Sequence, residues 1–137
     1  FSGVKKYIDR TLEFTKKEGY CETLFGRRRY LPELNATNYQ LRSAAERMAI
    51  NHPIQGTAAD LMKMAMIRVN ERLTISTKQI SSAKMILQVH DELVLEVKEE
   101  LAEEVAKIVK EAMENVVKLR VPVKVGISIG KSWGEMK

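Results

Sequence analysis

Two strand-like segments separated by only three residues constrain this chain more than any other feature of its sequence. Residues 85–89 form a largely apolar run, and residues 93–97 place leucine or valine at every second position. His90, Asp91 and Glu92 stand between them. Because so short a connection joins neighbouring strands of opposite direction, the sequence predicts an antiparallel hairpin with Asp91 at its tip.

Periodic patterns predict the remaining elements. Helices are expected at 3–17, 38–50, 53–73 and 99–117, short strands at 20–24 and 29–31 around Gly26, a polar connection at 74–82, and a final strand at 121–129. Pro53 is expected to interrupt the helical run, so that a new helix begins there with Asn51 as its cap. The small residues 56–59 would let another backbone approach closely. The order of elements predicts an α+β fold, an antiparallel sheet backed by helices.

Composition describes an ordinary globular chain with a basic balance. Hydrophobic residues make up 45% and charged residues 30% of the 137 positions, and the net charge is +5. No apolar run approaches the ~20 residues of a membrane span, so no membrane partner is expected. The single cysteine excludes an internal disulfide and favours an intracellular, reducing compartment. The first residue is Phe1 and not methionine, which favours a piece of a longer polypeptide, with processing of the chain as the alternative.

The hairpin tip offers metal-binding chemistry. A carboxylate such as Asp91, held by a rigid hairpin, can bind Mg²⁺, which favours one or two carboxylates together with substrate phosphates. One carboxylate is not enough for phosphoryl transfer with two metal ions, which needs further ligands. Polar residues are also common at hairpin turns, so an ordinary solvated turn is the alternative interpretation.

A second polar group follows a helical spacing. Arg47, Asn51 and Gln55 stand at i, i+4 and i+8, and share one face if the helical path continues near Pro53. Arginine can bind phosphates, while asparagine and glutamine can bond to bases or sugars. A solvated helix face is the alternative. The run 27–29 contains three arginines, which are candidate phosphate contacts or simply an exposed charged turn.

The segment 88–94, QVHDELV, resembles motif C of the family A DNA polymerases. The segments 22–32 (ETLFGRRRYLP), 45–60 (AERMAINHPIQGTAAD) and 121–123 (VPV) resemble further segments of that family in matching order, so that the resemblance covers essentially the whole chain. It implies that residues 1–137 form a single portion of a partial polymerase domain. This portion would be the C-terminal part of the palm, an antiparallel sheet that carries the motif C hairpin.

The resemblance also implies roles for individual residues. Asp91 matches the second metal-binding catalytic aspartate, Glu92 an active-site acid with a less direct metal contact, and His90 a residue near the primer terminus. Positions matching the polar residues of the helix contact template and primer; these residues are Arg47, Asn51 and Gln55. The resemblance adds no role for Arg27, Arg28 and Arg29, which stay candidate phosphate contacts on their charge alone. The implied reaction is attack of a primer 3′-hydroxyl on the α-phosphate of a deoxynucleoside triphosphate, with two Mg²⁺ ions, or Mn²⁺ in their place, in the complete enzyme.

Parts that such an enzyme needs are missing here. The family's other catalytic aspartate, in motif A, and its nucleotide-binding helix lie upstream and have no recognisable equivalent. The remainder is expected in the same polypeptide or in a second subunit, and the isolated chain is predicted to be inactive. The alternatives are a non-catalytic nucleic-acid-binding remnant and a purely structural interaction domain. The implied location is the bacterial cytoplasm, with the nucleoid, or another intracellular compartment.

Overall fold

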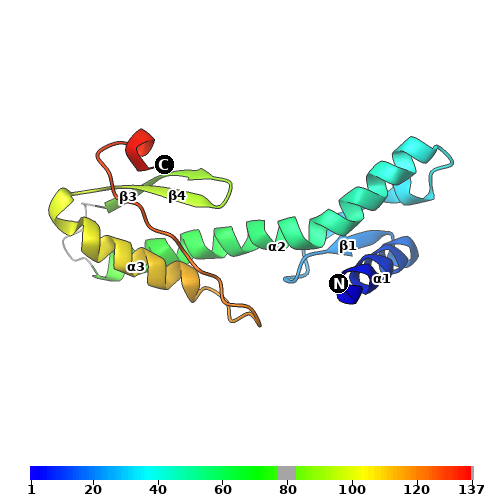
Figure 1. Ribbon diagram of the computed structural model, residues 1–137, viewed down its shortest axis with the longest axis horizontal. Coiled ribbons are helices and arrows are strands. Elements are labelled where there is room, and N and C mark those ends of the chain that lie inside the picture. The colour runs from blue at the N-terminus through cyan, green and yellow to red at the C-terminus, as the bar shows by residue number, and fades with distance from the viewer. Residues whose placement is uncertain (77–82, 137) are drawn as a thin grey trace. The chain divides into compact units, whose positions relative to one another are not determined.

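The structure, a computed structural model, describes residues 1–76 and 83–136, and the chain divides into two compact units, Phe1–Asp60 and Leu61–Lys137 (Figure 1). In the described residues, each unit combines helices with one antiparallel pair of strands. This mixture agrees with the predicted α+β class. None of the helices in these residues combines the length and the hydropathy that a bilayer span requires.

The first unit begins with helix α1 (Ser2–Glu18), close to the predicted bounds. It ends because Gly19 takes a left-handed conformation, with φ of 79°. The Gly19 N–H donates to the carbonyl of Thr15 at 2.9 Å, which satisfies one of the carbonyls that a helix end leaves open. Lys16 and Lys17 lie in the last turn, where positive charge suits the helix dipole.

A short hairpin follows α1. Strands β1 (Tyr20–Glu22) and β2 (Arg28–Tyr30) pair antiparallel around the turn that contains Gly26, as predicted. Gly26 has φ of 81°, a conformation that side chains rarely adopt. The one-turn helix η1 (Pro32–Asn35) comes next. A small apolar cluster of residues from these elements and the following helix forms the core of this unit: Cys21, Leu31, Leu34, Ala45 and Ala49, with Leu12 and Met48 packed against it.

Helix α2 (Tyr39–Ser76) is the longest element of the described chain. Asn38 caps its beginning, because its side-chain oxygen accepts hydrogen bonds from the backbone N–H groups of Gln40 and Leu41 at 2.8 and 3.3 Å. Its first 22 residues, 39–60, belong to the first unit. The remainder belongs to the second unit.

The predicted interruption at Pro53 is wrong, and Asn51 is an interior residue of α2 rather than a cap. Proline removes one N–H and crowds the preceding turn, which usually kinks or ends a helix. Here α2 continues through Pro53, and the hydroxyl of Tyr7 donates to the carbonyl of Ile50 at 3.3 Å. Of the polar connection expected at 74–82, the first three residues continue α2, and residues 77–82 lie outside the described residues.

The second unit contains the hairpin that the sequence indicated most strongly. Strands β3 (Ala83–Val89) and β4 (Glu92–Val97) pair antiparallel. Met85 lies opposite Leu95, but the next pair is Leu87 with Val94, so Ile86 is an extra residue. Such a β-bulge reverses the alternation of side chains beyond it and increases the local twist.

One face of this hairpin packs on helices. After the short turn η2 (Glu99–Leu101), helix α3 (Ala102–Glu114) joins the end of α2 in a second core cluster. Its buried members come from the two helices: Val69, Leu73, Val105, Val109 and Ala112. Apolar side chains of both strands pack against them, including Met85, Leu93, Leu95 and Val97. The cluster therefore fixes the hairpin to helices α2 and α3 through one of its faces.

The expected final strand at 121–129 is not formed, although these residues are described. A β-strand requires a hydrogen-bonded neighbour, and neither β3 nor β4 pairs with this segment. It is held in part by a side chain, because the Val125 N–H donates to the Glu114 carboxylate at 2.9 Å. Helix α3 also ends at Glu114, three residues before the predicted limit. The chain closes with the short turn η3 (Trp133–Met136).

Candidate nucleic-acid and metal-binding residues

The helical stripe Arg47–Asn51–Gln55, which we call the polar stripe, lies on one exposed face of α2. Because α2 continues through Pro53, the i, i+4 and i+8 spacing places the three side chains along the same face. Arg47 Nη1 donates to the Ser43 hydroxyl at 2.9 Å, one turn earlier on that face. The sequence predicted a common face only if the helix continues through Pro53, and α2 does continue there.

The chemistry of the polar stripe is that of a donor-rich surface. A guanidinium presents five N–H donors, and each amide presents donors and an acceptor. The neighbouring carboxylate of Glu46 is engaged by Lys16, with Nζ–Oε1 of 3.2 Å. The exposed stripe thus keeps its positive charge and can bond to phosphate, sugar or base edges.

The tip of the β3–β4 hairpin is a two-residue loop. Val89 pairs with Glu92, so His90 and Asp91 alone form the turn, and all three polar residues at 90–92 are exposed. His90 has φ of 53°, in the left-handed region that is uncommon for a residue with a side chain. The Gln88 side-chain amide donates to the His90 carbonyl at 2.6 Å, which ties the turn to β3. The turn thus presents Asp91 to solvent on a defined backbone.

The carboxylates at this tip suit a hard cation but do not complete a site. Asp91 and Glu92 offer the oxygen ligands that Mg²⁺ prefers. In the described part of the chain, no three His, Cys, Asp or Glu side chains come together as a metal site. The residues present therefore fit an Mg²⁺ ion whose other ligands come from elsewhere.

The three neighbouring arginines each turn to a different partner. Arg27 Nε donates to Asp60 Oδ1 at 2.7 Å, whereas Arg28 lies over the Tyr20 ring at 4.4 Å from its centroid. Arg29 Nη2 lies 3.0 Å from the sulfur of Met48. The phosphate-binding role that their sequence suggests stays a prediction, and their guanidinium groups have protein partners of their own.

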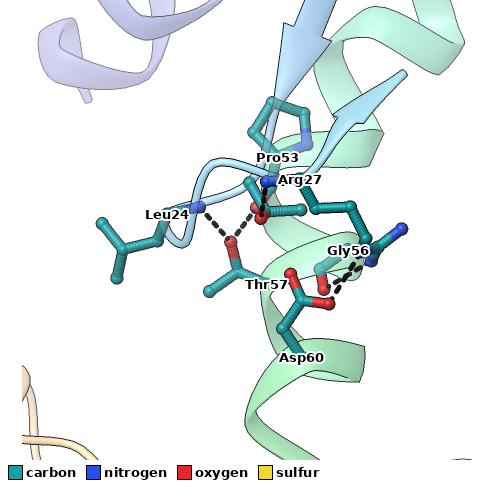
Figure 2. A network of polar contacts seen from close by, with 7 residues as sticks. Leu24, Arg27, Pro53, Gly56, Thr57 and Asp60 are labelled. Carbon is teal, nitrogen blue, oxygen red and sulfur yellow. Dashed lines mark hydrogen bonds and ion pairs between the residues drawn. The ribbon is translucent and has the colours of Figure 1, made fainter.

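Sequence reasoning missed the network that joins the β1–β2 turn to α2 (Figure 2). Arg27 also donates from Nη2 to the Gly56 carbonyl at 3.0 Å, and the Leu24 N–H donates to the Thr57 hydroxyl at 2.9 Å. The Thr57 hydroxyl in turn donates to the Pro53 carbonyl. The small residues at 56–59 were the available signal, and at Gly56 it is the side chains of Thr23, Arg27 and His52 that approach closely.

Comparisons with known proteins agree on one family. The family described as DNA polymerase family A matches residues 1–135. The thermostable DNA polymerase I of Thermus thermophilus is 55% identical over 130 residues, and the DNA polymerase I of Bacillus caldotenax is 48% identical over 137 residues. These alignments cover 95% and 100% of this chain but only 15% of either relative. The chain therefore spans about a seventh of their length.

A solved structure is similar to the whole chain. It is the POL domain of Pol1 from M. smegmatis in complex with DNA primer-template and dNTP, with a TM-score of 0.93 and 44% sequence identity. The match covers 99% of this chain and 24% of that one. The arrangement of helices and small sheets described above is thus that of part of a polymerase domain.

Proposed function

The chain belongs to DNA polymerase family A, and we propose that residues 1–137 supply one catalytic carboxylate and part of the primer–template surface of a DNA-directed DNA polymerase. In this proposal the β3–β4 hairpin is the motif C hairpin of the palm. The parent enzyme extends a DNA primer with deoxynucleotides, as a nucleotidyltransferase. Its remaining parts lie upstream, in the same polypeptide or a second subunit.

The hairpin tip is proposed to hold a divalent metal ion. Asp91 is the ligand, Glu92 a nearby acid with a less direct role, and His90 a contact to the primer terminus. Bound Mg²⁺, or Mn²⁺ in its place, would supply charge stabilisation for the transferring phosphate and for the leaving pyrophosphate. This chain's part is to present the Asp91 carboxylate on a backbone that pairing and the Gln88 hydrogen bond keep in place.

The polar stripe is proposed to bind primer–template DNA near the growing end. Arg47 would neutralise phosphate, while Asn51 and Gln55 would bond to sugars or base edges. Support comes from the common exposed face of the three side chains and from the family membership. The solved relative contains DNA primer-template and dNTP, which makes these the expected partners here too.

One observation supports the proposal most directly. His90 and Asp91 form the two-residue loop of the β3–β4 hairpin, and the Asp91 carboxylate is exposed there, in a chain that belongs to this family. The test is single-turnover nucleotide incorporation by a polymerase polypeptide that contains this chain, at saturating Mg²⁺. Asp91→Asn keeps the shape of the side chain and tolerates turn geometry, but lacks the charge that holds the metal. Incorporation should fall by orders of magnitude, roughly 10³-fold or more, because that charge acts mainly in the transition state.

Controls separate chemistry from folding. Glu92→Gln should lose less activity than Asp91→Asn, and both variants should keep the melting temperature and DNA affinity of the wild type. Incorporation within about threefold of wild type by Asp91→Asn would exclude Asp91 as a catalytic ligand, since a threefold change is below 1 kcal/mol. If the wild-type polypeptide binds DNA but never incorporates nucleotide, the chain is a non-catalytic binding remnant.

A further inference from the structure

The β1–β2 turn lies against α2 at the residue that follows Gln55. A β-carbon added to Gly56 would stand 2.7 Å from the Thr23 γ-methyl and 3.2 Å from Arg27 Nη2. Gly56 is buried, whereas Gln55 beside it is exposed. The β1–β2 turn therefore contacts α2 at Gly56, the residue next to Gln55 of the polar stripe. The contact lies on the buried side of the helix, and Gln55 lies on the exposed side.

Arg27 bridges this contact with two nitrogen atoms of its guanidinium, Nε and Nη2 (Figure 2). Nε donates to Asp60 Oδ1 at 2.7 Å, and Nη2 donates to the Gly56 carbonyl at 3.0 Å. The Asp60 side chain is only 12% exposed, so the pair lies against the helix rather than in open solvent. The forked, planar group reaches two acceptors one helical turn apart, which the single ammonium of a lysine cannot reproduce.

A second tie holds the other end of the turn. The Leu24 N–H donates to the Thr57 hydroxyl at 2.9 Å, and the Arg27 N–H donates to the Thr23 hydroxyl at 3.2 Å. The turn is thus bound to residues 56, 57 and 60, which directly follow Gln55. In the described residues the exposed Gln55 amide has no hydrogen-bond partner in the protein, so the protein fixes this residue only through the helix backbone that carries it.

We propose that Arg27 is a positioning residue for DNA binding: it fixes the turn of α2 after Gln55 and so holds the Gln55 amide where primer–template needs it. The proposal rests on the proposed function, since it assumes that Gln55 contacts DNA. Arg27 acts through the helix and not on a phosphate. Its ion-pair partner Asp60 is then required for DNA binding although it carries the same sign of charge as DNA.

Asp60 gives the sharpest test. The measurement is the dissociation constant of primer–template, by fluorescence anisotropy over a series of salt concentrations, for a polymerase polypeptide that contains this chain. Arg27→Gln and Asp60→Asn are each expected to weaken binding by about two- to thirtyfold, the range that coupling through a contact network gives. The double variant should be no weaker than either single variant. The slope of log affinity against log salt should stay unchanged.

A direct phosphate contact predicts the opposite pattern. Arg27→Gln would then lower the salt slope by ~1, and Asp60→Asn would leave binding unchanged or tighten it, because it removes a negative charge. Either result overturns the proposal. Arg72→Gln is the matched control, since Arg72 also sits in an ion pair, is also 45% exposed and loses the same charge. It should leave affinity unchanged.

Two further variants separate positioning from folding. Arg27→Lys keeps the charge but loses the fork, so positioning predicts weaker binding and a phosphate contact predicts near-normal binding. In a Gln55→Ala background, Arg27→Gln should add little further loss; a fully additive loss would show a general structural role and overturn the proposal. If Gln55→Ala alone binds DNA normally, the DNA contact itself is wrong, and the positioning role falls with it. Melting curves recorded alongside ensure that every comparison is made on folded protein.

Discussion

Arg72 of α2 and Glu111 of α3 form an ion pair with 2.9 Å between Nη2 and Oε1, at the border of the apolar cluster that joins these helices. Their side chains are 45% and 64% exposed. Solvent and salt weaken such a pair, so Glu111→Gln should lower the free energy of unfolding by less than ~1 kcal/mol. Urea unfolding at low and at ~0.5 M salt checks this, because any contribution should shrink at the higher salt.

The apolar side chains beneath that pair should matter more. Val69 is a member of this cluster and is 0% exposed to solvent. Val69→Ala removes two methyl groups and leaves a cavity, so the free energy of unfolding should fall by about 2–3 kcal/mol. The measurement is the same urea titration. An effect no larger than that of Glu111→Gln would mean that the cluster does not hold these helices together.

Gly56 should tolerate no side chain. The β-carbon of Gly56→Ala would stand 2.7 Å from Thr23 Cγ2, and Thr23 is buried, branched at its β-carbon and bonded through its hydroxyl. We expect a loss of about 1–3 kcal/mol, the usual consequence of overpacking. Gly3→Ala is the control, because Gly3 is also helical and has nothing within 4 Å of the added carbon. That change should stabilise α1 slightly, by less than the ~1 kcal/mol that alanine gains over glycine in a helix interior, because Gly3 lies in the first turn. Thermal melts of the two variants should therefore shift in opposite directions.

Cys21 should be protected from alkylation. It is 1% exposed, and burial raises the pKa of its thiol above the ordinary 9.0, although a backbone hydrogen bond and the Arg29 charge act in the opposite sense. Iodoacetamide at pH 8 should react at least ~10-fold more slowly with the folded chain than with the chain in guanidinium, since the thiolate is the reactive form.

The raised pKa also sets a sign for stability. A thiol that holds its proton more tightly when folded contributes stability that is complete below the unfolded pKa, near pH 9, and is lost as pH rises further. The difference in unfolding free energy between wild type and Cys21→Ala should therefore shrink above that pH. A difference that grew with pH would contradict this assignment.

The 137-residue chain by itself should not extend a primer. It carries the proposed motif C carboxylate but neither motif A nor a nucleotide-binding helix, and a lone hairpin carboxylate does not complete a two-metal site. A primer-extension assay with Mg²⁺ and all four deoxynucleotides should stay at background. Synthesis by chain free of contaminating polymerase would show that the ligand set is counted wrongly.

Local patterns predicted most of the elements. Periodicity located α1, α3 and both hairpins, because each keeps one apolar face or strand alternation over its length. It also predicted the common face of the polar stripe. The roles of these residues in DNA and metal binding stay predictions, since they depend on molecules beyond this chain.

What local patterns missed depends on distant partners. Pro53 should break a helix by local rules, yet α2 continues through it. The segment at 121–129 has strand-like residues, but in the described residues it pairs with neither β3 nor β4. The Arg27–Asp60 pair spans 33 residues, and nothing near Arg27 in sequence distinguishes it from its two neighbouring arginines. Such contacts follow from packing and not from propensity.

Because His90 has a left-handed backbone, selection for stability and selection for DNA synthesis should favour different residues at this position. That conformation costs a residue with a β-carbon about 1 kcal/mol of free energy, whereas glycine adopts it freely. A population of variants chosen only for heat resistance should therefore drift toward glycine at position 90. Variants selected for accurate copying of DNA should instead keep histidine, because the proposed contact with the primer terminus needs the imidazole. The residue found at position 90 in each population would then distinguish a role in stability from a role in DNA synthesis.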